Sequence, residues 1–546
     1  MSSAGTLAPP VSPLPPSVSA LRATPLPANL QSIVSVTEAS PCRVSLSVRV
    51  LATLALLGWF GVILFDGLWA GPLFRTEALR ALVADEMVRS GNWLVPHCYH
   101  APLLTKPPGA YVAIALASLP AGGVEEWSAR LPSAVAGGLC MLLLGWHFGR
   151  RLGASSAWIV AALLAMSALW LEKVPTAEID SLQVFWVTAS LVFFFRAIDA
   201  ENELASWGQR QFWWTAALIC VTGGFLTKWT APAFFYLTAI PLLWWRGRLR
   251  LLFGRCHLLA AVTAATVALA WIAAVVIQTG PYLLRQTLAR EALMRLLPSE
   301  HDRAYPWLEV LTHPLRVVAA ALPGSLAAII ACRRSFGMRL DECGRRTWQE
   351  MHCWIWPNLL FWTIIPEHAT RHSFPLLPGL AGLAALVWTA WLHGNLHWPV
   401  LRIQPRQVLA AALGIWLIVK LFYVHGILPA QYQQRDVERK AEQLAEAVPP
   451  SSTIYICRAA DDGLQGILFY YSKRHADDNR VPVERLGLSD HLPSSAEPIY
   501  CIVDERDWDA DALGWCALRQ QARAQRVYAF RDERDVPLLL VRVEPG

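Results

Sequence analysis

The sequence predicts a mainly α-helical fold: a polytopic transmembrane helical bundle of about 11 to 13 spans, followed by a small soluble α/β domain. Of the 546 residues, 55% are hydrophobic and only 16% are charged, whereas soluble domains carry about 25% charged residues. The mean hydropathy is +0.36. The 26 Trp and 19 Phe suit the aromatic belts of membrane interfaces. A chain of this composition would aggregate in water and belongs in a bilayer.

Apolar runs of suitable length follow one another along the first four fifths of the chain. A membrane-spanning helix needs about 20 apolar residues, and the first such run is 45–65. Residues 1–43 are rich in Pro, Ser, Ala and Thr, which predicts a disordered cytoplasmic tail. The apolar stretch 111–120 is too short to cross. Further candidate spans lie at 132–148, 155–171, 181–197, 212–227, 230–245, 257–278, 316–332, 353–366, 374–392 and 407–425.

Arginine-rich connectors predict the orientation of these spans, because cytoplasmic loops carry an excess of Lys and Arg. If the N-terminus is cytoplasmic and the spans alternate, the basic connectors at 150–151, 246–255 and 333–346 all lie in the cytoplasm. The basic residues therefore indicate topology, and no nucleic-acid partner is expected. The segments predicted to lie outside are the loops 66–131, 172–180, 279–315 and 366–373, and everything after about residue 426.

The last part of the chain, 429–546, differs from the transmembrane domain 44–428. Charged residues occur throughout it, and short β-type runs alternate with helix-like stretches. This pattern predicts a small extracytoplasmic α/β domain. The β-type runs are 453–458, 466–472, 498–504, 526–530 and 536–543, and the helix-like stretches include 436–447 and 509–524.

Ionisable residues gather in the predicted outer loops, whereas a transporter keeps its functional charges near mid-membrane. Carboxylates and cations that converge on one membrane face can bind a phosphate and carry out acid–base chemistry. Solvated loop charges are the alternative for any single residue. The candidates are Glu77, Arg80, Lys106 and Arg130 in or beside the first outer loop, Glu178 and Asp180 in the second, and Lys228 and Arg371 beside later spans.

Several short motifs occur in an order that is typical of one enzyme family. They are Ala84–Met87, Ser90–Pro96, Lys106–Pro108, Ala129–Pro132 and Phe225–Lys228. In this combination the sequence resembles the GT-C membrane glycosyltransferases, in particular the group of the lipid A aminoarabinose transferase and the dolichyl-phosphate-mannose protein mannosyltransferases. The resemblance covers most of 45–425, whereas the terminal domain resembles no family in particular.

The resemblance implies an inverting transfer of one sugar from a polyprenyl-phosphate-linked donor to lipid A, another envelope glycan or a protein. It also implies an integral protein of the bacterial inner membrane with an extracytoplasmic active site. Lys106, Lys228 and Arg371 are the candidates for holding the leaving lipid phosphate. Arg80, Arg130 and Glu178 are expected to support substrate binding. The rival classes are a transporter or flippase, and a scaffold whose soluble tail binds partners.

The chain departs from the family at the residue that activates the acceptor. The family usually has Asp-Glu where this chain has Thr76-Glu77, so the aspartate that usually carries this role is missing. Two interpretations stay open: Glu77 acts as the general base, or Asp180 does so and Glu77 orients a neighbour. We favour Glu77. An inactive homologue is a third interpretation.

No cofactor is expected to be required. His97, Cys98 and His100 invite a metal interpretation, and some relatives are thought to bind a divalent cation. However, the three residues are too close in sequence for a standard structural zinc pattern. The 11 cysteines include no C-x-x-C pair, so they indicate no redox compartment.

Overall fold

A computed structural model describes residues 46–296, 305–366, 369–394, 396, 404–450, 452–457, 463–474, 483–486, 497–510 and 514–545. The chain divides into two compact units, Met1–Leu56 and Leu57–Gly546. In the first unit only 46–56 are described, and they form the beginning of helix α1 (Leu46–Phe65). The predicted tail 1–43 lies outside the described residues.

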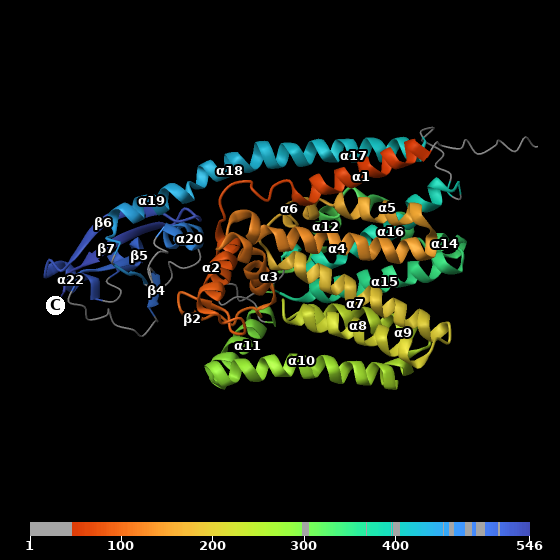
Figure 1. The fold of residues 1–546 in the computed structure, drawn as a ribbon, viewed down its shortest axis with the longest axis horizontal. Coiled ribbons are helices and arrows are strands. Elements are labelled where there is room, and N and C mark those ends of the chain that lie inside the picture. The colour runs from red at the N-terminus through yellow and green to blue at the C-terminus, as the bar shows by residue number, and fades with distance from the viewer. Residues whose placement is uncertain are drawn as a thin grey trace, which may run out of the picture. The chain divides into compact units, whose positions relative to one another are not determined.

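Helices make up most of the second unit (Figure 1). The helices before the sheet domain are α2 (Arg75–Ser90), α3 (Gly109–Ser118), α4 (Glu126–Leu152), α5 (Ala154–Ala165), α6 (Ala168–Lys173), α7 (Ile179–Asn202), α8 (Trp207–Phe225), α9 (Ala231–Trp245), α10 (Arg255–Thr279), α11 (Pro281–Leu296), α12 (Trp307–Ala320), α13 (Gly324–Ala331), α14 (Arg334–Arg339), α15 (Glu342–Ile364), α16 (Leu377–Leu392), α17 (Pro405–Phe422) and α18 (Leu428–Arg435). Short 3₁₀ segments lie at Leu119–Ala121, Leu249–Phe253 and Thr370–Leu376.

The predicted transmembrane helical fold is confirmed, and every candidate span lies largely on helical residues. Among the described residues, five helices are long and apolar enough to cross a membrane. A sixth candidate is the pair α12 and α13, which bends by 112° at its break. The predicted number of about 11 spans is larger than these five or six. The difference arises because several apolar helices, such as Ala154–Ala165 and Ala231–Trp245, are shorter than a full span requires. The span number therefore stays a prediction.

Helix α7 forms the centre of the bundle and packs against α4, α8 and α9. Its sequence is apolar on nearly all sides, and such a helix is expected to be buried in the protein rather than at its surface. Accordingly, 78% of the most apolar 18-residue stretch of α7 is buried inside the protein, compared with only 17% of the corresponding stretch of α10. Both α4 and α7 begin at the end of the bundle that carries α2 and α3, which we call the α2–α3 end.

The C-terminal domain contains a five-stranded sheet in the order β4–β3–β5–β7–β6. Strands β3 (Ile454–Cys457), β4 (Val483–Leu486) and β5 (Ile499–Asp504) run parallel, whereas β6 (Ala524–Arg531) and β7 (Pro537–Val543) are antiparallel to their neighbours. Helices α19 (Val437–Ala447), α20 (Gln465–Arg474), α21 (Glu505–Asp509) and α22 (Trp515–Gln520) complete the domain. The predicted α/β class of this domain is confirmed.

The prediction of a β-run at 466–472 is wrong, because these residues belong to helix α20. Its apolar run Ile467–Tyr471 is buried on all sides, and periodicity cannot distinguish a short buried helix from a buried strand. Strand β4 was not predicted. Its four residues are too few and too polar for a clear strand signal.

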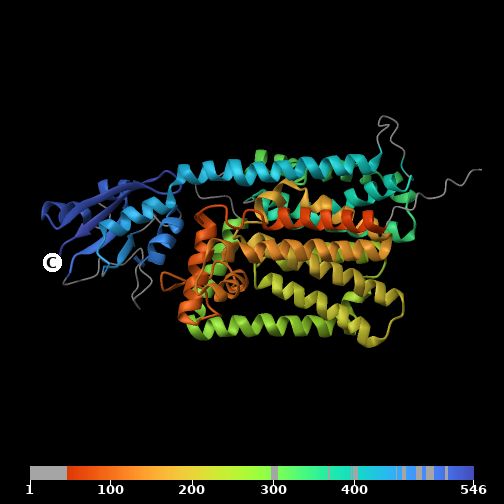
Figure 2. The same ribbon diagram turned by 45° about the horizontal axis from the view of Figure 1, so that its top comes forward.

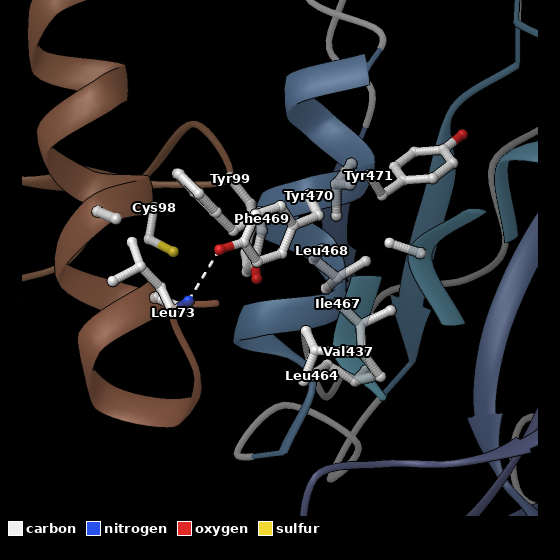
Figure 3. Packing of buried hydrophobic residues seen from close by; sticks show 14 of the residues in the cluster. Leu73, Cys98, Tyr99, Val437, Leu464, Ile467, Leu468, Phe469, Tyr470 and Tyr471 are labelled. Carbon is white, nitrogen blue, oxygen red and sulfur yellow. Dashed lines mark hydrogen bonds between the residues drawn. The ribbon is translucent and has the colours of Figure 1, made fainter. Parts of the chain in front are cut away.

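Helix α20 docks the C-terminal domain onto the α2–α3 end. One hydrophobic core includes Leu73 and Met87 of the first loop together with Ile467 and Leu468 of α20. Figure 3 shows the Tyr470 hydroxyl between the two sides, where it accepts a hydrogen bond from the Leu73 backbone N–H at 2.8 Å. The sheet accordingly lies beyond the α2–α3 end of the helices in both views (Figures 1 and 2). The domain is therefore joined to the loop that carries several candidate site residues.

A continuous helical stretch connects the bundle to this domain. Helix α17 passes through a π-helical turn at Tyr423–Ile427 into α18, and the stretch Pro405–Ala447 is one candidate span by length and composition. The predicted boundary between 428 and 429 falls within this stretch. The π-turn places Tyr423 on a cavity at the α2–α3 end, in line with the frequent occurrence of π-turns at functional sites.

Candidate active site

Two turns at the α2–α3 end are held together by backbone contacts. The Gly109 N–H donates to the carbonyl oxygen of Leu226 at 2.7 Å, and the indole Nε1 of Trp229 donates to the carbonyl oxygen of Thr105 at 3.1 Å. A Cβ atom at Gly109 would lie 2.7 Å from the same Leu226 oxygen, so only glycine permits this approach. The contact brings the Lys-Pro-Pro turn and the end of α8 together.

These turns border a cavity of about 200 Å³, which we call the small cavity. Its lining includes four basic side chains, two lysines and two arginines, and three carboxylates. Such a concentration of ionisable groups in a space of this size is typical of a site for a charged ligand. The lining residues are Thr76, Arg80, Lys106, Glu178, Ile179, Asp180, Lys228, Glu291, Arg371 and His372.

Two lysines of the small cavity are paired with carboxylates. The Lys228 ammonium lies 2.6 Å from Oδ1 of Asp180, and both side chains are about 95% buried. The Lys106 ammonium lies 2.8 Å from Oε2 of Glu291, a pair that is partly exposed. Each lysine therefore faces the cavity beside a carboxylate partner.

Glu77 does not line the small cavity but forms a buried bidentate ion pair with Arg130. Both oxygens of the carboxylate accept from this guanidinium at 3.1 Å, and the Ala177 N–H donates to Oε1 at 2.8 Å. Arg130 also donates to the carbonyl oxygens of Leu68 and Gly71. This arrangement ties the start of the first loop to α4 and to the second loop, which is a structural role.

Glu77 and Arg130 do line a second cavity of about 790 Å³, which we call the large cavity. Its walls come from the start of α2, from the second loop, and from α18 and the C-terminal domain. Arg435 at the end of α18 lies on this wall, with its guanidinium 3.7 Å from the centre of the Phe74 ring. Because α18 and the terminal domain contribute to the wall, this cavity is complete only when the domain is docked.

Lys173, also on the large cavity, has a raised pKa. Burial lowers the pKa of this ammonium, but the neighbouring carboxylates of Glu172 and Glu178 outweigh the effect of burial. Lys173 therefore stays protonated and adds a positive charge to this wall.

Glu178 lies where the two cavities meet, and it lines both of them. Oε1 accepts a hydrogen bond from the Thr76 hydroxyl at 2.5 Å. Oε2 lies 3.8 Å from the Arg80 guanidinium and has no hydrogen-bond partner in the part of the chain that the structure describes. The side chain is only 7% exposed. A buried carboxylate with one unused oxygen can accept a proton or a hydrogen bond from a ligand.

The structure brings six of the eight sequence candidates together around the small cavity: Arg80, Lys106, Glu178, Asp180, Lys228 and Arg371. Glu77, which we favoured as the general base, does not line the small cavity that Lys106 and Asp180 share. Its carboxylate faces Arg130 because the guanidinium matches both oxygens. Which carboxylate acts as the base stays untested by this geometry.

Sequence reasoning did not select Glu291 or Arg435 as site residues. Glu291 belongs to α11, whose charged residues have the pattern of a solvent-exposed helix face. Only the contact with Lys106 distinguishes Glu291 from the other charged residues of this helix. Arg435 follows the last span, and its place on the large cavity depends on how α18 packs. No local signal in the sequence indicates either position.

The metal interpretation of the first loop does not fit the geometry. The His97 Nδ1 lies 2.8 Å from the Val95 carbonyl oxygen, Cys98 is buried in the hydrophobic core, and His100 faces Glu86. Among the described residues, no group of three or more His, Cys, Asp and Glu side chains is arranged to hold a metal ion. These three residues therefore form no joint site.

Comparison with known proteins supports the resemblance drawn from the motifs. Residues 105–277 match the family model of the dolichyl-phosphate-mannose-protein mannosyltransferases. This range includes Lys106, Glu178, Asp180 and Lys228.

The chain is also similar to undecaprenyl phosphate-α-4-amino-4-deoxy-L-arabinose arabinosyl transferases of Pseudomonas. It is 27% identical to that of Pseudomonas savastanoi pv. phaseolicola over 370 residues, 66% of this chain and 64% of the relative. It is 28% identical to that of Pseudomonas paraeruginosa over 383 residues, 68% of this chain and 64% of the relative. The match thus spans slightly less than two thirds of the length of these curated relatives.

The fold is that of a solved structure, ArnT from Cupriavidus metallidurans bound to undecaprenyl phosphate. The TM-score is 0.67 at 17% identity, over 90% of this chain and 98% of that one. The apo form of the same protein matches equally well, with a TM-score of 0.67. The predicted resemblance to the GT-C membrane glycosyltransferases is confirmed, and the chain is an integral membrane protein with their fold.

Proposed function

We propose that this protein is a membrane glycosyltransferase that moves one sugar from a polyprenyl-phosphate-linked donor to an O–H group of an envelope acceptor. The observation that carries the proposal is the pair of adjoining cavities, of which the small one concentrates four cations. The names of the Pseudomonas relatives, which include undecaprenyl phosphate and aminoarabinose, support the donor class. The donor phosphate would occupy the small cavity and the acceptor the large one.

The cations of the small cavity suit the chemistry of a leaving phosphate. When the bond between the sugar C1 and the phosphate oxygen breaks, its electron pair stays on the phosphate and the negative charge grows. Preorganised cations stabilise such a developing charge most strongly in a site that excludes water. Lys106, Lys228 and Arg371 would hold this phosphate, supported by Arg80. The reaction is proposed to invert the configuration at C1 and to require no cofactor.

The acceptor and the membrane face complete the proposal. Lipid A, another envelope glycan and a protein are the acceptor classes, and the large cavity offers room and positive charge from Arg75, Arg130, Lys173 and Arg435. We place the site on the extracytoplasmic face of the inner membrane, because the arginine-rich connectors sort to the opposite side. Reporters fused after Arg255 and after Gly546 should report opposite sides of the membrane; the same side for both would contradict this topology.

The direct test is donor turnover by the purified full-length protein in proteoliposomes. Undecaprenyl-phosphate-linked aminoarabinose and hexoses are supplied as donors, with lipid A, a lipid-linked glycan or peptides as acceptors. Release of free undecaprenyl phosphate and a mass shift of one acceptor by one sugar are the expected results. No release from any donor would contradict the function. Mass analysis of envelope lipids and glycoproteins in a deletion strain identifies the natural acceptor.

A transporter or flippase is the rival function. It would move the labelled donor across the proteoliposome membrane without releasing lipid phosphate, so the same preparation distinguishes the two. The buried charges that line the two cavities lie at one end of the helices, whereas a transport pathway needs them near mid-membrane. This distribution favours transfer over transport.

A further inference from the structure

We infer that Glu178 is the general base of the transfer and that Thr76 positions it, an inference that rests on the proposed function. The transfer needs a proton acceptor beside the acceptor oxygen and close to the sugar C1. The sugar C1 would lie where the small cavity meets the large one, because the donor phosphate and the acceptor occupy one cavity each.

Only a few side chains reach this boundary. Among the described residues, Thr76, Glu178 and Arg371 line both cavities. A threonine hydroxyl is too weak a base at neutral pH, and an arginine stays protonated. Glu178 is therefore the boundary group that can take a proton from an acceptor hydroxyl.

The hydrogen bonds of Glu178 leave one oxygen for the acceptor. Oε1 is held by the Thr76 hydroxyl at 2.5 Å, whereas Oε2 has no hydrogen-bond partner in the described part of the protein. The backbone is also fixed, because the carbonyl oxygen of Glu178 accepts from the Ser133 hydroxyl at 3.0 Å. A positioned base needs a fixed carboxylate with an oxygen that no donor occupies, and the buried Oε2 of Glu178, a residue that lines both cavities, meets this requirement.

The other carboxylates of the site are more fully engaged by cations. Both oxygens of Glu77 accept from Arg130, Oδ1 of Asp180 accepts from a lysine at 2.6 Å, and Oε2 of Glu291 accepts from another lysine at 2.8 Å. Glu178 has a weaker ionic contact, with Arg80 at 3.8 Å. A carboxylate in a short ion pair is a poorer proton acceptor, because the cation stabilises its charged form.

The proton and electron balance of the step is complete. The acceptor O–H proton moves to Oε2 of Glu178 while the acceptor oxygen forms a bond to the sugar C1. The bond from C1 to the phosphate oxygen breaks, and its electron pair leaves with the lipid phosphate. Glu178 then returns its proton to water after the product departs.

The first test replaces Glu178 by glutamine, which preserves the shape and the Thr76 contact but removes the proton acceptor. Glu178→Gln should lower kcat about 10²- to 10⁴-fold, the usual contribution of a positioned base. Its Kd for the undecaprenyl-phosphate-linked donor, measured by tryptophan fluorescence, should stay within about threefold of the wild type, because the base acts only in the transition state. Asp85→Asn, a carboxylate of α2 paired with Arg89 and outside both cavities, is the control that should retain full turnover.

Two results would overturn the assignment: turnover of Glu178→Gln close to that of the wild type, or a parallel loss of donor binding, which would make Glu178 structural. If the wild type itself released no lipid phosphate, the proposed function would fail instead. Active wild type with active Glu178→Gln would remove only the base assignment. The two failures are thus distinguishable.

The role of Thr76 is tested by the pH profile. Thr76→Val keeps the side-chain shape but removes the hydrogen bond that favours the charged carboxylate. The acid limb of kcat/KM should therefore move to higher pH, with maximal turnover largely preserved. A limb that stays in place would exclude Thr76 as the positioning residue.

Discussion

The bundle contains two clusters of buried charges at opposite ends of α4 and α7, and they differ in how their central carboxylates are hydrogen-bonded. At the far end, Glu350 is fully buried and accepts from His147 at 3.1 Å, Arg151 at 2.5 Å and Arg246 at 3.2 Å. At the α2–α3 end, similar groups surround a cavity, and Oε2 of Glu178 has no hydrogen-bond partner among the described residues.

This difference separates charges that hold helices from charges that await a ligand. The Glu350 cluster joins α4, α15 and the end of α9, and Arg151 extends it to Asp199 of α7 at 2.7 Å. The three hydrogen bonds to the Glu350 carboxylate all come from side chains of the bundle itself. A buried charge alone is therefore weak evidence of function, and an adjoining cavity is what makes the α2–α3 end a candidate site.

The largest expected effect concerns the far cluster. Glu350→Gln would leave Arg246 without this carboxylate and Arg151 with Asp199 alone, and breaking a buried ion pair costs about 3–5 kcal/mol. We expect a large fall in the thermal unfolding temperature in detergent, with unchanged turnover per folded molecule. The matched control is Glu342→Gln on the same helix, an exposed glutamate paired with Arg346, whose unfolding temperature should stay unchanged. Equal effects of the two variants would contradict the comparison.

The next effect concerns a cation of the small cavity. Lys106→Ala should raise the donor Kd about 10- to 100-fold and lower turnover, because a hydrogen bond to a charged group contributes about 1.5–3 kcal/mol. Its thermal stability should change little, since the pair with Glu291 is partly exposed. The control is Lys473→Ala, an exposed lysine paired with Glu125 at 2.7 Å. Unchanged donor binding in Lys106→Ala would remove this lysine from the site.

A third prediction tests the backbone contact that shapes the small cavity. Gly109→Ala would place a Cβ 2.7 Å from the Leu226 carbonyl oxygen, and overpacking of this kind costs about 1–3 kcal/mol. We expect weaker donor binding, because the two turns that carry Lys106 and Lys228 must separate. Gly123→Ala is the control, since no atom lies within 4 Å of its added Cβ. Normal donor affinity in Gly109→Ala would show that the contact is dispensable.

The smallest effect concerns Glu533, a buried carboxylate that is held by two backbone N–H groups. Glu533 accepts from the backbone N–H groups of Arg75 and Gly466, joining the C-terminal domain to the start of α2. Burial raises the pKa of Glu533 above its ordinary value of 4.5, outweighing these two hydrogen bonds. The folded protein therefore binds this proton more tightly than the unfolded chain.

It follows that stability falls as pH rises from about 4.5 through the raised pKa of Glu533. The contribution of this group is complete below the pKa of the unfolded chain. Glu533→Gln cannot ionise, so its unfolding temperature should decline less over the same range. Identical pH dependence of the two proteins would contradict this sign.

The sequence alone was sufficient to predict the helical bundle and the terminal α/β domain, and to select six residues that line the small cavity. Apolar run length and charge are local properties, so they can be read from neighbouring residues. The motifs also located the two turns that bear Lys106 and Lys228. The helix α20 was misread as a strand because a short buried run carries no distinguishing period.

Only the tertiary structure decided which carboxylate pairs with which cation. Glu77 and Arg130 are 53 residues apart, Thr76 and Glu178 are 102 apart, and Lys106 and Glu291 are 185 apart. In the sequence, a glutamate that pairs with an arginine looks the same as a glutamate that keeps an unused oxygen. The difference between Glu77 and Glu178 arises from packing, because the docking of distant helices sets the distance and angle of every hydrogen bond.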